Sequence, residues 1–218
     1  MKFSRLLFSI TVLLSLVLLL PAGGYAAAYP ESGRPIRLVV PFAPGGNVDI
    51  ITRAISNELG QTLGAPIVVD NRAGAGGAIG SDIVAKASPD GYTTLMVSAS
   101  HVINPSMVKK LPYDTVKAFA AVSMVSDVPT VLVVHPSVQA KTLKEFIALA
   151  KANPGKLNMG TSGIGTVGHL SGELLKSMAQ IKIEVIHYKG AGPALIDLLR
   201  GHVQLQFVSM PAAIAHIK

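Results

Sequence analysis

Residues 36–64 read I-R-L-V-V-P-F-A-P-G-G-N-V-D-I-I-T-R-A-I-S-N-E-L-G-Q-T-L-G, and this stretch decides the fold. The apolar, β-branched run 36–42 predicts a buried strand. Pro44 and the two glycines after it break the run. From Val48 the apolar residues follow helical spacing, and Gly64 stands where a helix would end. The sequence therefore predicts a strand, a Gly-rich loop and a helix that begins at that loop.

The N-terminus of this helix is a candidate anion site. The first turn of a helix has N–H groups without an intrahelical acceptor, and the helix dipole adds partial positive charge. Gly45 and Gly46 would let the backbone approach a ligand closely. An ordinary strand-to-helix turn, with Asn47 as N-cap and Asp49 complementing the dipole, explains the same residues. The stretch thus indicates a carboxylate or phosphate site or a plain turn, and Asp49 argues mildly against phosphate.

The first 28 residues have the pattern of a secretory signal peptide. Lys2 and Arg5 precede the apolar run 6–20, and the tract 26–28 (A-A-A) offers a cleavage site. We expect cleavage after Ala28 and a periplasmic mature chain. An uncleaved membrane anchor is the alternative, although about 15 apolar residues are short of the roughly 20 that span a bilayer.

Composition excludes several classes of protein. The chain has 218 residues, no Cys, 5% aromatic residues and a formal charge of +7, which becomes +5 without Lys2 and Arg5 (7 − 2). Scattered basic residues and few aromatic ones argue against nucleic-acid binding. The absence of Cys excludes thiol chemistry and disulfides. A mild positive field would help to collect acidic solutes.

Apolar runs and turn signals alternate along the rest of the chain. Thr142 and Glu145 form a capping box before one of the helical patterns. The alternation predicts an α/β fold with mostly parallel strands. We expect further strands at 66–70, 93–98, 120–125, 130–135, 157–160, 181–188 and 203–208, further helices at 79–87, 142–152, 169–179, 193–199 and 211–218, and an irregular segment at 99–114.

The unit of strand, Gly-rich loop and helix occurs twice, at 36–63 and at 157–179. This repetition predicts two lobes that each aim a helix N-terminus at a shared cleft. A hinge between them is expected near Asp127–Thr130. A third Gly-rich loop, 71–80, is interpreted as a tight loop packed on the sheet.

The second loop also has the layout of a dinucleotide-binding loop. Gly163, Gly165 and Gly168 follow a predicted strand and open a helix, and Glu184 stands at the end of the next predicted strand. A nicotinamide-dependent oxidoreductase is therefore an alternative, and replacement of Glu184 should then weaken cofactor binding. The export signal argues against it, as does the placement of the motif away from the first strand.

Other catalytic constellations are missing from the sequence. No G-x-S-x-G or H-E-x-x-H motif occurs, the six histidines have no ligand spacing, and no general acid–base pair is evident. His169 directly follows the second loop and either contacts a ligand or simply lies in the first helical turn. We expect no enzyme activity, no metal site and no cofactor.

Several motifs together resemble the Bug-type substrate-binding receptors of tripartite tricarboxylate transporters. The resemblance runs from about Tyr29 to Lys218 with the motifs in family order. It implies a type II periplasmic-binding-protein fold with two lobes around a cleft, the first at 29–128 and the second at 129–218. It rests on P-F-A-P-G-G-N-V-D (41–49), N-R-A-G-A-G-G-A-I-G (71–80), P-D-G-Y-T (89–93), L-P-Y-D (111–114), G-T-S-G-I-G-T-V-G-H-L (160–170), Y-K-G-A-G-P-A (188–194) and D-L-L-R-G (197–201).

The resemblance also implies a site and partners. In that family two loops grip the carboxylates of a small metabolite, mainly through backbone N–H groups and ordered waters, and membrane permease subunits receive the ligand. A monomer is expected. The implied site residues are Phe42, Ala43, Gly45, Gly46, Asn47 and Asp49 in the first loop, Thr161, Ser162, Gly163, Thr166 and His169 in the second, and Ser100, His101 and Tyr188 as cleft walls.

The chain departs from the family pattern in three places. The family usually has Pro at the position of His187 and Asp at the position of Gln204. Its members also continue well beyond Lys218, and the continuing chain completes the first lobe. The resemblance therefore implies a chain without this return segment, and a non-functional truncated paralogue is a further alternative.

Overall fold

The computed structural model describes residues 29–217. Its contacts divide the chain into Met1–Glu31 and Ser32–Lys218, and everything below concerns the second unit. The expected signal peptide and its cleavage site lie outside the described residues. Within residues 29–217, no helix has the length and apolar character needed to cross a membrane.

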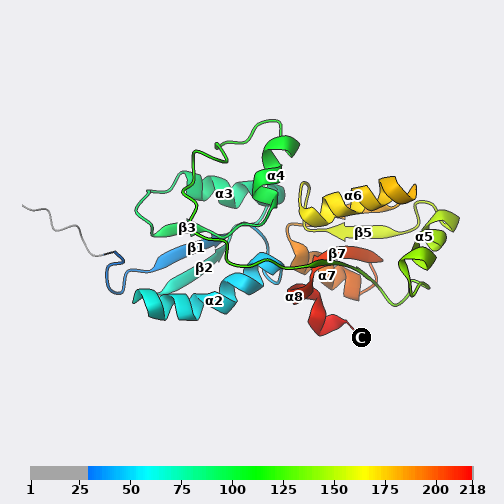
Figure 1. Cartoon of the computed structure of the whole chain (residues 1–218), viewed down its shortest axis with the longest axis horizontal. Coiled ribbons are helices and arrows are strands. Elements are labelled where there is room, and N and C mark those ends of the chain that lie inside the picture. The colour runs from blue at the N-terminus through cyan, green and yellow to red at the C-terminus, as the bar shows by residue number, and fades with distance from the viewer. Residues whose placement is uncertain (1–28, 218) are drawn as a thin grey trace, which may run out of the picture. The chain divides into compact units, whose positions relative to one another are not determined.

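Residues 32–128, called the first half below, are built on a parallel sheet of order β2-β1-β3 (Figure 1). The central strand β1 is almost fully buried because α2 covers one face of the sheet and α3 the other. The elements are β1 (Ile36–Val40), α2 (Asn47–Leu63), β2 (Ile67–Asn71), the 3-10 helix η1 (Ala75–Gly77), α3 (Ala78–Ala85), β3 (Thr93–Leu95) and α4 (Ser100–Met107).

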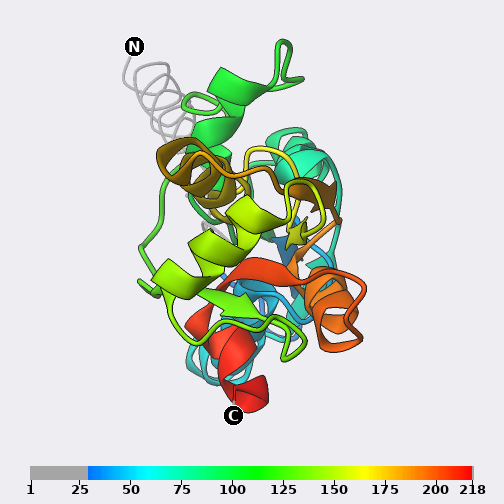
Figure 2. The same ribbon diagram turned by 90° about the vertical axis from the view of Figure 1, so that its right-hand side faces the viewer.

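Residues 129–217, called the second half, contain a sheet of order β4-β7-β5-β6. β5 is parallel to β6 and β7, whereas β4 is antiparallel to β7. Figure 2, in which this half faces the viewer, shows α5 in front of the strands. The elements are β4 (Thr130–Val134), α5 (Leu143–Ala152), β5 (Asn158–Thr161), α6 (Val167–Ala179), β6 (Glu184–His187), α7 (Ala191–Leu199), β7 (Leu205–Ser209), α8 (Met210–Ala213) and η2 (Ile214–His216).

The core of the second half lies between its sheet and α5. Phe146 and Ala150 of α5 pack on Met159 of β5 and Leu205 of β7, and all four are at least 97% buried. The helix starts as its capping box predicts, since Thr142 Oγ1 accepts from the Glu145 N–H at 3.2 Å. The α/β class with mostly parallel pairing is confirmed, as is the end of α2 at Gly64, which adopts the αL conformation.

Two predicted segments were wrong. Residues 120–125 form no strand, because no described backbone pairs with them, and Val122 and Met124 are 91% and 84% exposed. Residues 99–114 are not wholly irregular, since α4 occupies 100–107 with Pro105 inside it. Proline removes one intrahelical hydrogen bond, but buried Asn104 of α4 donates to a backbone carbonyl outside the helix and anchors it.

Two helix ends also differ from prediction. The N-cap of α2 is Gly46, not Asn47, and no side chain caps this helix. The helix predicted at 211–218 is only the single turn α8, followed by the 3-10 turn η2 and an extended Ile217.

Candidate functional site

The first loop presents the N-terminus of α2 toward the second half (Figure 1). The first intrahelical bond runs from the Ile50 N–H to Gly46 O at 2.9 Å. The N–H groups of Asn47, Val48 and Asp49 therefore have no acceptor within the helix. Together with the helix dipole, they form a positively polarised end that suits an anion.

Asp49 holds this loop in shape. Its carboxylate accepts hydrogen bonds from the Gly45 N–H, Arg53 Nε and Asn71 Nδ2, each at 3.0 Å, and the residue is 4% exposed. Burial raises the pKa of Asp49, but the bonds from Arg53, Gly45 and Asn71 outweigh it and hold the pKa below its usual value. Asn71 Nδ2 also donates to Phe42 O at 3.0 Å, which ties the loop to β2. The carboxylate of Asp49 is thus hydrogen-bonded within the protein and stabilises the shape of the loop.

The second loop, between β5 and α6, has its own internal bonds. Thr166 is the N-cap of α6, and its hydroxyl donates to Gly163 O at 2.7 Å. Leu170 N–H donates to Thr166 O, so the N–H groups of Val167, Gly168 and His169 lack an acceptor within the helix. This is a second polarised helix end, on a helix of 13 residues.

Two histidines stand behind the second loop. His169 Nδ1 accepts the Gly165 N–H at 3.2 Å, and His187 Nδ1 lies 2.8 Å from Thr161 Oγ1. The two rings meet edge to face with centroids 4.8 Å apart. Burial lowers the pKa of His187, and the charge of His169 lowers it further, against an opposing effect of Glu173. The pair orients the loop from the side of β6.

Ile50 of α2 packs on the buried cluster that includes Ala212 and Ala213 of α8. The halves also meet at two seams, where backbone approaches backbone. At the first seam, loop 43–46 meets loop 189–192. Ala43 N–H donates to Lys189 O at 3.0 Å, and a Cβ on Gly46 would lie 3.5 Å from Ala191 Cβ. A Cβ on Gly192 would overlap the carbonyl oxygen of Pro44. This seam brings the N-terminal ends of α2 and α7 together.

At the second seam, loop 74–77 meets loop 163–165. A Cβ on Gly76 would overlap the carbonyl oxygen of Ile164, and one on Gly163 would lie 3.7 Å from Gly76 Cα. Asn104 of α4 holds this contact, since its Nδ2 donates to Gly76 O at 3.2 Å. The sequence had suggested only that loop 71–80 packs on its own sheet, but this loop also contacts the second half.

The sequence analysis named no residue of α4 beyond Ser100 and His101, and none of loop 74–77, as part of the site. One signal was available, since residues 74–77 all have positive φ and one of them is Ala75, at φ 47°. A non-glycine residue in this region is uncommon. The contact of Asn104 had no sequence signal, because it depends on the approach of α4 to loop 74–77, and Asn104 and Gly76 are 28 residues apart in the sequence.

Three of the predicted wall residues face other partners. His101 stacks on Tyr113 and meets Phe119 edge to face at 4.8 Å. Ser100 is 2% exposed and lies 3.0 Å from the Ser98 hydroxyl, oxygen to oxygen. The Tyr188 hydroxyl donates to Asp197 Oδ2 at 2.6 Å. Burial, with the hydrogen bond to Asp197, raises the pKa of Tyr188 to about 12.

Because the Tyr188 hydroxyl is committed to Asp197, Tyr188→Phe should lower the free energy of unfolding by about 1 kcal/mol. Ligand affinity should stay within about twofold of wild type, since the aromatic ring remains. Chemical denaturation and calorimetric titration measure the two effects. Tyr113→Phe is the matched control, because the buried Tyr113 hydroxyl has no partner among the described residues and its loss should cost nothing. A large loss of affinity in Tyr188→Phe would show that the hydroxyl faces the ligand instead.

Glu184 does not stand where a dinucleotide site needs it. It begins β6 and pairs with Asn158, whereas the glycine loop follows Thr161, which pairs with His187. In a parallel sheet Glu184 is therefore at the edge opposite the loop. The prediction that it ends its strand was wrong, and the dinucleotide alternative loses its ribose partner.

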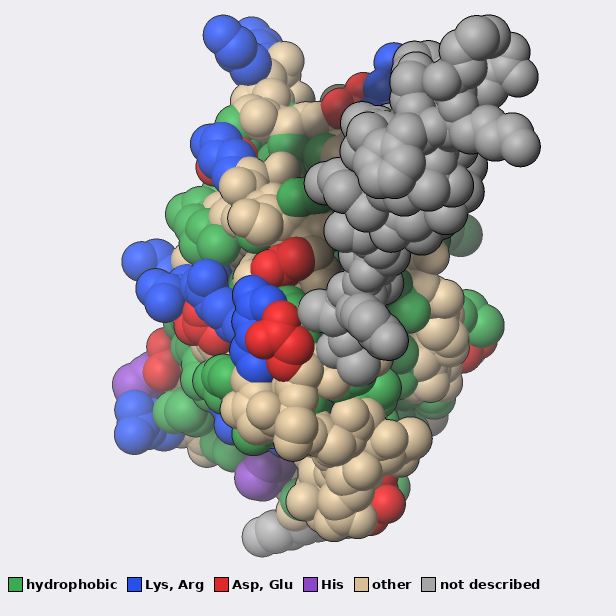
Figure 3. Space-filling model, turned by 90° about the vertical axis from the view of Figure 1, so that its left-hand side faces the viewer, with side chains coloured by type: hydrophobic (Ala, Val, Ile, Leu, Met, Phe, Trp, Pro, Cys, Tyr) green, Lys and Arg blue, Asp and Glu red, His purple; other side chains and the backbone are tan. Residues whose placement is uncertain are grey.

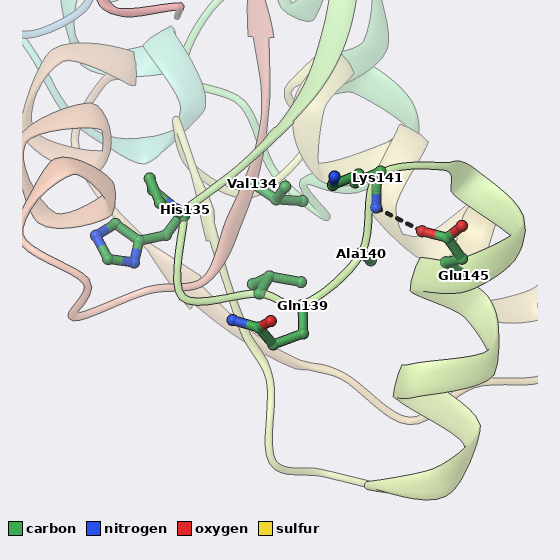
Figure 4. A pocket seen from close by; sticks show the side chains of 8 residues that line it. Val134, His135, Gln139, Ala140, Lys141 and Glu145 are labelled. Carbon is green, nitrogen blue, oxygen red and sulfur yellow. Dashed lines mark hydrogen bonds between the residues drawn. The ribbon is translucent and has the colours of Figure 1, made fainter.

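Two cavities lie away from the loops. One of about 410 Å³ is lined by residues from the end of β4 to the start of α5, including His135 and Lys141 (Figure 4). The backbone N–H of Lys141 in this lining donates to Glu145 Oε2 at 2.7 Å. The carboxylate of Glu145 places a negative charge beside the cavity. Another of about 570 Å³ runs beside the C-terminal end of α2, from Ser56 to Ile67. Neither includes a predicted site residue.

Gln204, where the resembled family usually has Asp, is a structural residue. Its Oε1 accepts the Asn158 N–H at 2.9 Å, and its Nε2 donates to Gly201 O at 2.9 Å. These bonds fasten the turn between α7 and β7 to the start of β5, and they do not involve either seam.

Charges of both signs are mixed on the surface of the first half. Asp70 bridges Arg37 and Arg72, Arg34 pairs with Asp90, and the face in Figure 3 shows basic and acidic side chains next to one another. Among the described residues no group of three or more His, Cys, Asp or Glu side chains is placed to hold a metal ion. The free N–H groups at the N-termini of α2 and α6 are therefore the feature of this site that is suited to binding an anion.

A family model described as "Tripartite tricarboxylate transporter family receptor" matches residues 51–218. The chain belongs to this family. Protein BugT of Bordetella pertussis is 43% identical to it over 195 residues, which are 88% of this chain and 59% of BugT. The chain spans 54–65% of the length of the first three curated relatives that it matches.

Solved structures agree with the fold. The periplasmic binding protein BugD is 36% identical with a TM-score of 0.83, over 87% of this chain and 62% of BugD. Rpa4515 of R. palustris, solved with adipate, is 35% identical with a TM-score of 0.81, over 85% and 62%. MatC of Rhodopseudomonas palustris, solved with malate, is 33% identical with a TM-score of 0.78, over 84% and 62%. The fold is that of the periplasmic binding proteins, and the chain spans 62% of each of these three solved chains.

Proposed function

We propose that this protein is the solute receptor of a tripartite tricarboxylate-type transporter and binds a small carboxylated metabolite between its two halves. One observation carries the proposal: the first turns of α2 and α6 each have three N–H groups without an intrahelical acceptor. The loops that precede these two helices take part in the two seams. The structures solved with adipate and malate support a carboxylate. The proposed contacts are those of the two predicted loops, with Asp49 shaping the first.

The affinity that such a site needs is within reach of backbone donors. Charge-assisted hydrogen bonds contribute roughly 1.5–3 kcal/mol each. Micromolar binding needs about 8 kcal/mol. Two or three such bonds on each carboxylate cover that requirement after the costs of closure. One helix dipole, at about 1 kcal/mol, would not.

The proposal includes the location and the partners. The chain is exported to the periplasm, cleaved after Ala28, monomeric, and delivers its ligand to membrane permease subunits. The two lobes are 29–128 and 129–218, and they hinge near Asp127–Thr130. This segment is the end of the connection from α4 to β4, and Asp127 and Pro129 are exposed.

The test is thermal unfolding of the purified chain with succinate, malate, adipate, aspartate, citrate and NAD(H). One or more carboxylates at 100 times their Kd should stabilise the folded chain by about 2.7 kcal/mol, which raises Tm by several degrees. A rise with NAD(H) alone would support the oxidoreductase. No rise with any carboxylate would contradict the receptor.

A further inference from the structure

A buried amide stands at the second seam with its oxygen unpaired. Asn104 is 1% exposed, and its Nδ2 donates to Gly76 O at 3.2 Å. Its Oδ1 is buried and accepts no hydrogen bond from any residue in 29–217. The oxygen and nitrogen of this amide cannot be exchanged, because the nitrogen must face the Gly76 carbonyl. Oδ1 is therefore an acceptor without a donor.

This oxygen lies where the two halves meet. Oδ1 lies 3.4 Å from the Cβ position of Gly165 and 3.3 Å from that of Gly76. Gly165 belongs to the loop that precedes α6, and its own N–H is committed to His169. The Gly165 N–H is therefore not available as a donor to Asn104 Oδ1.

A second buried amide repeats the pattern near the first seam. Gln206 of β7 is fully buried, its Nε2 donates to Ala191 O at 3.3 Å, and its Oε1 accepts from no described residue. Ala191 is the residue that Gly46 meets across the seam. Buried polar atoms are nearly always paired, so two such oxygens beside one candidate site need an explanation.

We propose that the ligand supplies the missing donor, and that Asn104 selects carboxylates with a hydroxyl or ammonium group on the carbon next to a carboxylate. This inference rests on the proposed function. The first-turn N–H groups of α6 hold the carboxylate, and Asn104 Oδ1 faces Gly165, two residues before that turn. In this proposal the donor lies one or two bonds from the carboxylate carbon and reaches this oxygen. A ligand without the donor leaves the buried acceptor unpaired and binds more weakly.

The experiment compares succinate, malate and aspartate by calorimetric titration in wild type and in Asn104→Leu, which has nearly the same size and no polar atoms. Malate or aspartate should bind wild type at least about tenfold more tightly than succinate. In Asn104→Leu this preference should fall below about twofold, mainly through the loss for the donor-bearing ligand. Ser106→Ala, an exposed position on the same helix, is the control and should keep the preference. Gln206→Met tests the second amide in the same way.

Three results would overturn the assignment. Equal binding of succinate and the donor-bearing acids by folded wild type would show that no donor is read. A preference that survives Asn104→Leu would place its origin elsewhere. Equal weakening of all ligands would show that an ordered water serves Oδ1, or that Asn104 acts by holding Gly76. If no carboxylate binds wild type at all, the proposed function itself fails, which is distinct from equal binding. Asn104→Ala, which also has no side-chain polar atom, gives the same comparison if the leucine variant does not fold.

Discussion

Gly192→Ala is expected to weaken carboxylate binding by about tenfold to a hundredfold. A Cβ at this position would overlap the carbonyl oxygen of Pro44 and approach Gly45 C at 3.2 Å, across the first seam. Both contacts are backbone atoms, which cannot rotate away. Overpacking of this kind costs about 1–3 kcal/mol, and each 1.4 kcal/mol is a factor of ten in affinity. The halves can relieve the clash by separating, and separation removes one loop from the ligand.

The same substitution should leave the fold intact. Gly192 lies in the first turn of α7, where Ala is favoured over Gly by up to about 1 kcal/mol. We therefore expect the free energy of unfolding to change by less than about 1 kcal/mol while affinity falls. Calorimetric titration and denaturant unfolding separate the two effects. Ile196→Ala, at an exposed position of the same helix, should bind like wild type. Normal binding by Gly192→Ala would show that the first seam does not have to close.

Asp49→Asn is expected to have the largest effect on stability, lowering the free energy of unfolding by about 2–4 kcal/mol. One carboxylate oxygen becomes an NH2 group that faces one of the donors Gly45 N, Arg53 or Asn71. At roughly 2–4 °C per kcal/mol for a chain of this size, Tm should fall by about 5–15 °C. Glu58→Gln, exposed on the same helix, is the control and should be neutral. A stable Asp49→Asn would mean that the amide re-pairs within the loop.

The pH dependence of this difference follows from the lowered pKa of Asp49. The folded chain binds the Asp49 proton less readily than the unfolded chain, so this residue stabilises the fold above the unfolded pKa of about 3.9. That contribution is lost as pH falls through the lower folded value. The Tm gap between wild type and Asp49→Asn should be full at pH 6–7 and should narrow below about pH 4. A gap that is unchanged at pH 3 would contradict the role of the charge.

Local patterns determined most of the secondary structure. The strand Ile36–Val40 is visible because burial on both faces gives a continuous apolar run. The helix to Leu63 is visible because burial of one face gives a period of 3.6. The Thr142 capping box is local as well, and it was predicted correctly. The family could be predicted from the sequence because several of its motifs occur in the family's order along the chain.

Only the tertiary structure decided which polar groups are left for a ligand. Asp49 and Tyr188 were predicted to line the site, but Arg53, Asn71 and Asp197 take up their polar atoms. Their spacing does not reveal this, because the partners come from other elements.

The reverse holds for Asn104 and Gly192, whose contacts form where segments distant in sequence meet. Residues 120–125 show the same limit, since an apolar run becomes a strand only where another backbone pairs with it. The sequence by itself determined the elements and the family of this protein, because both depend on contacts between near neighbours or on motif order. The tertiary structure decided the seams and the unpaired amide oxygens, because a hydrogen bond depends on which atoms meet in space.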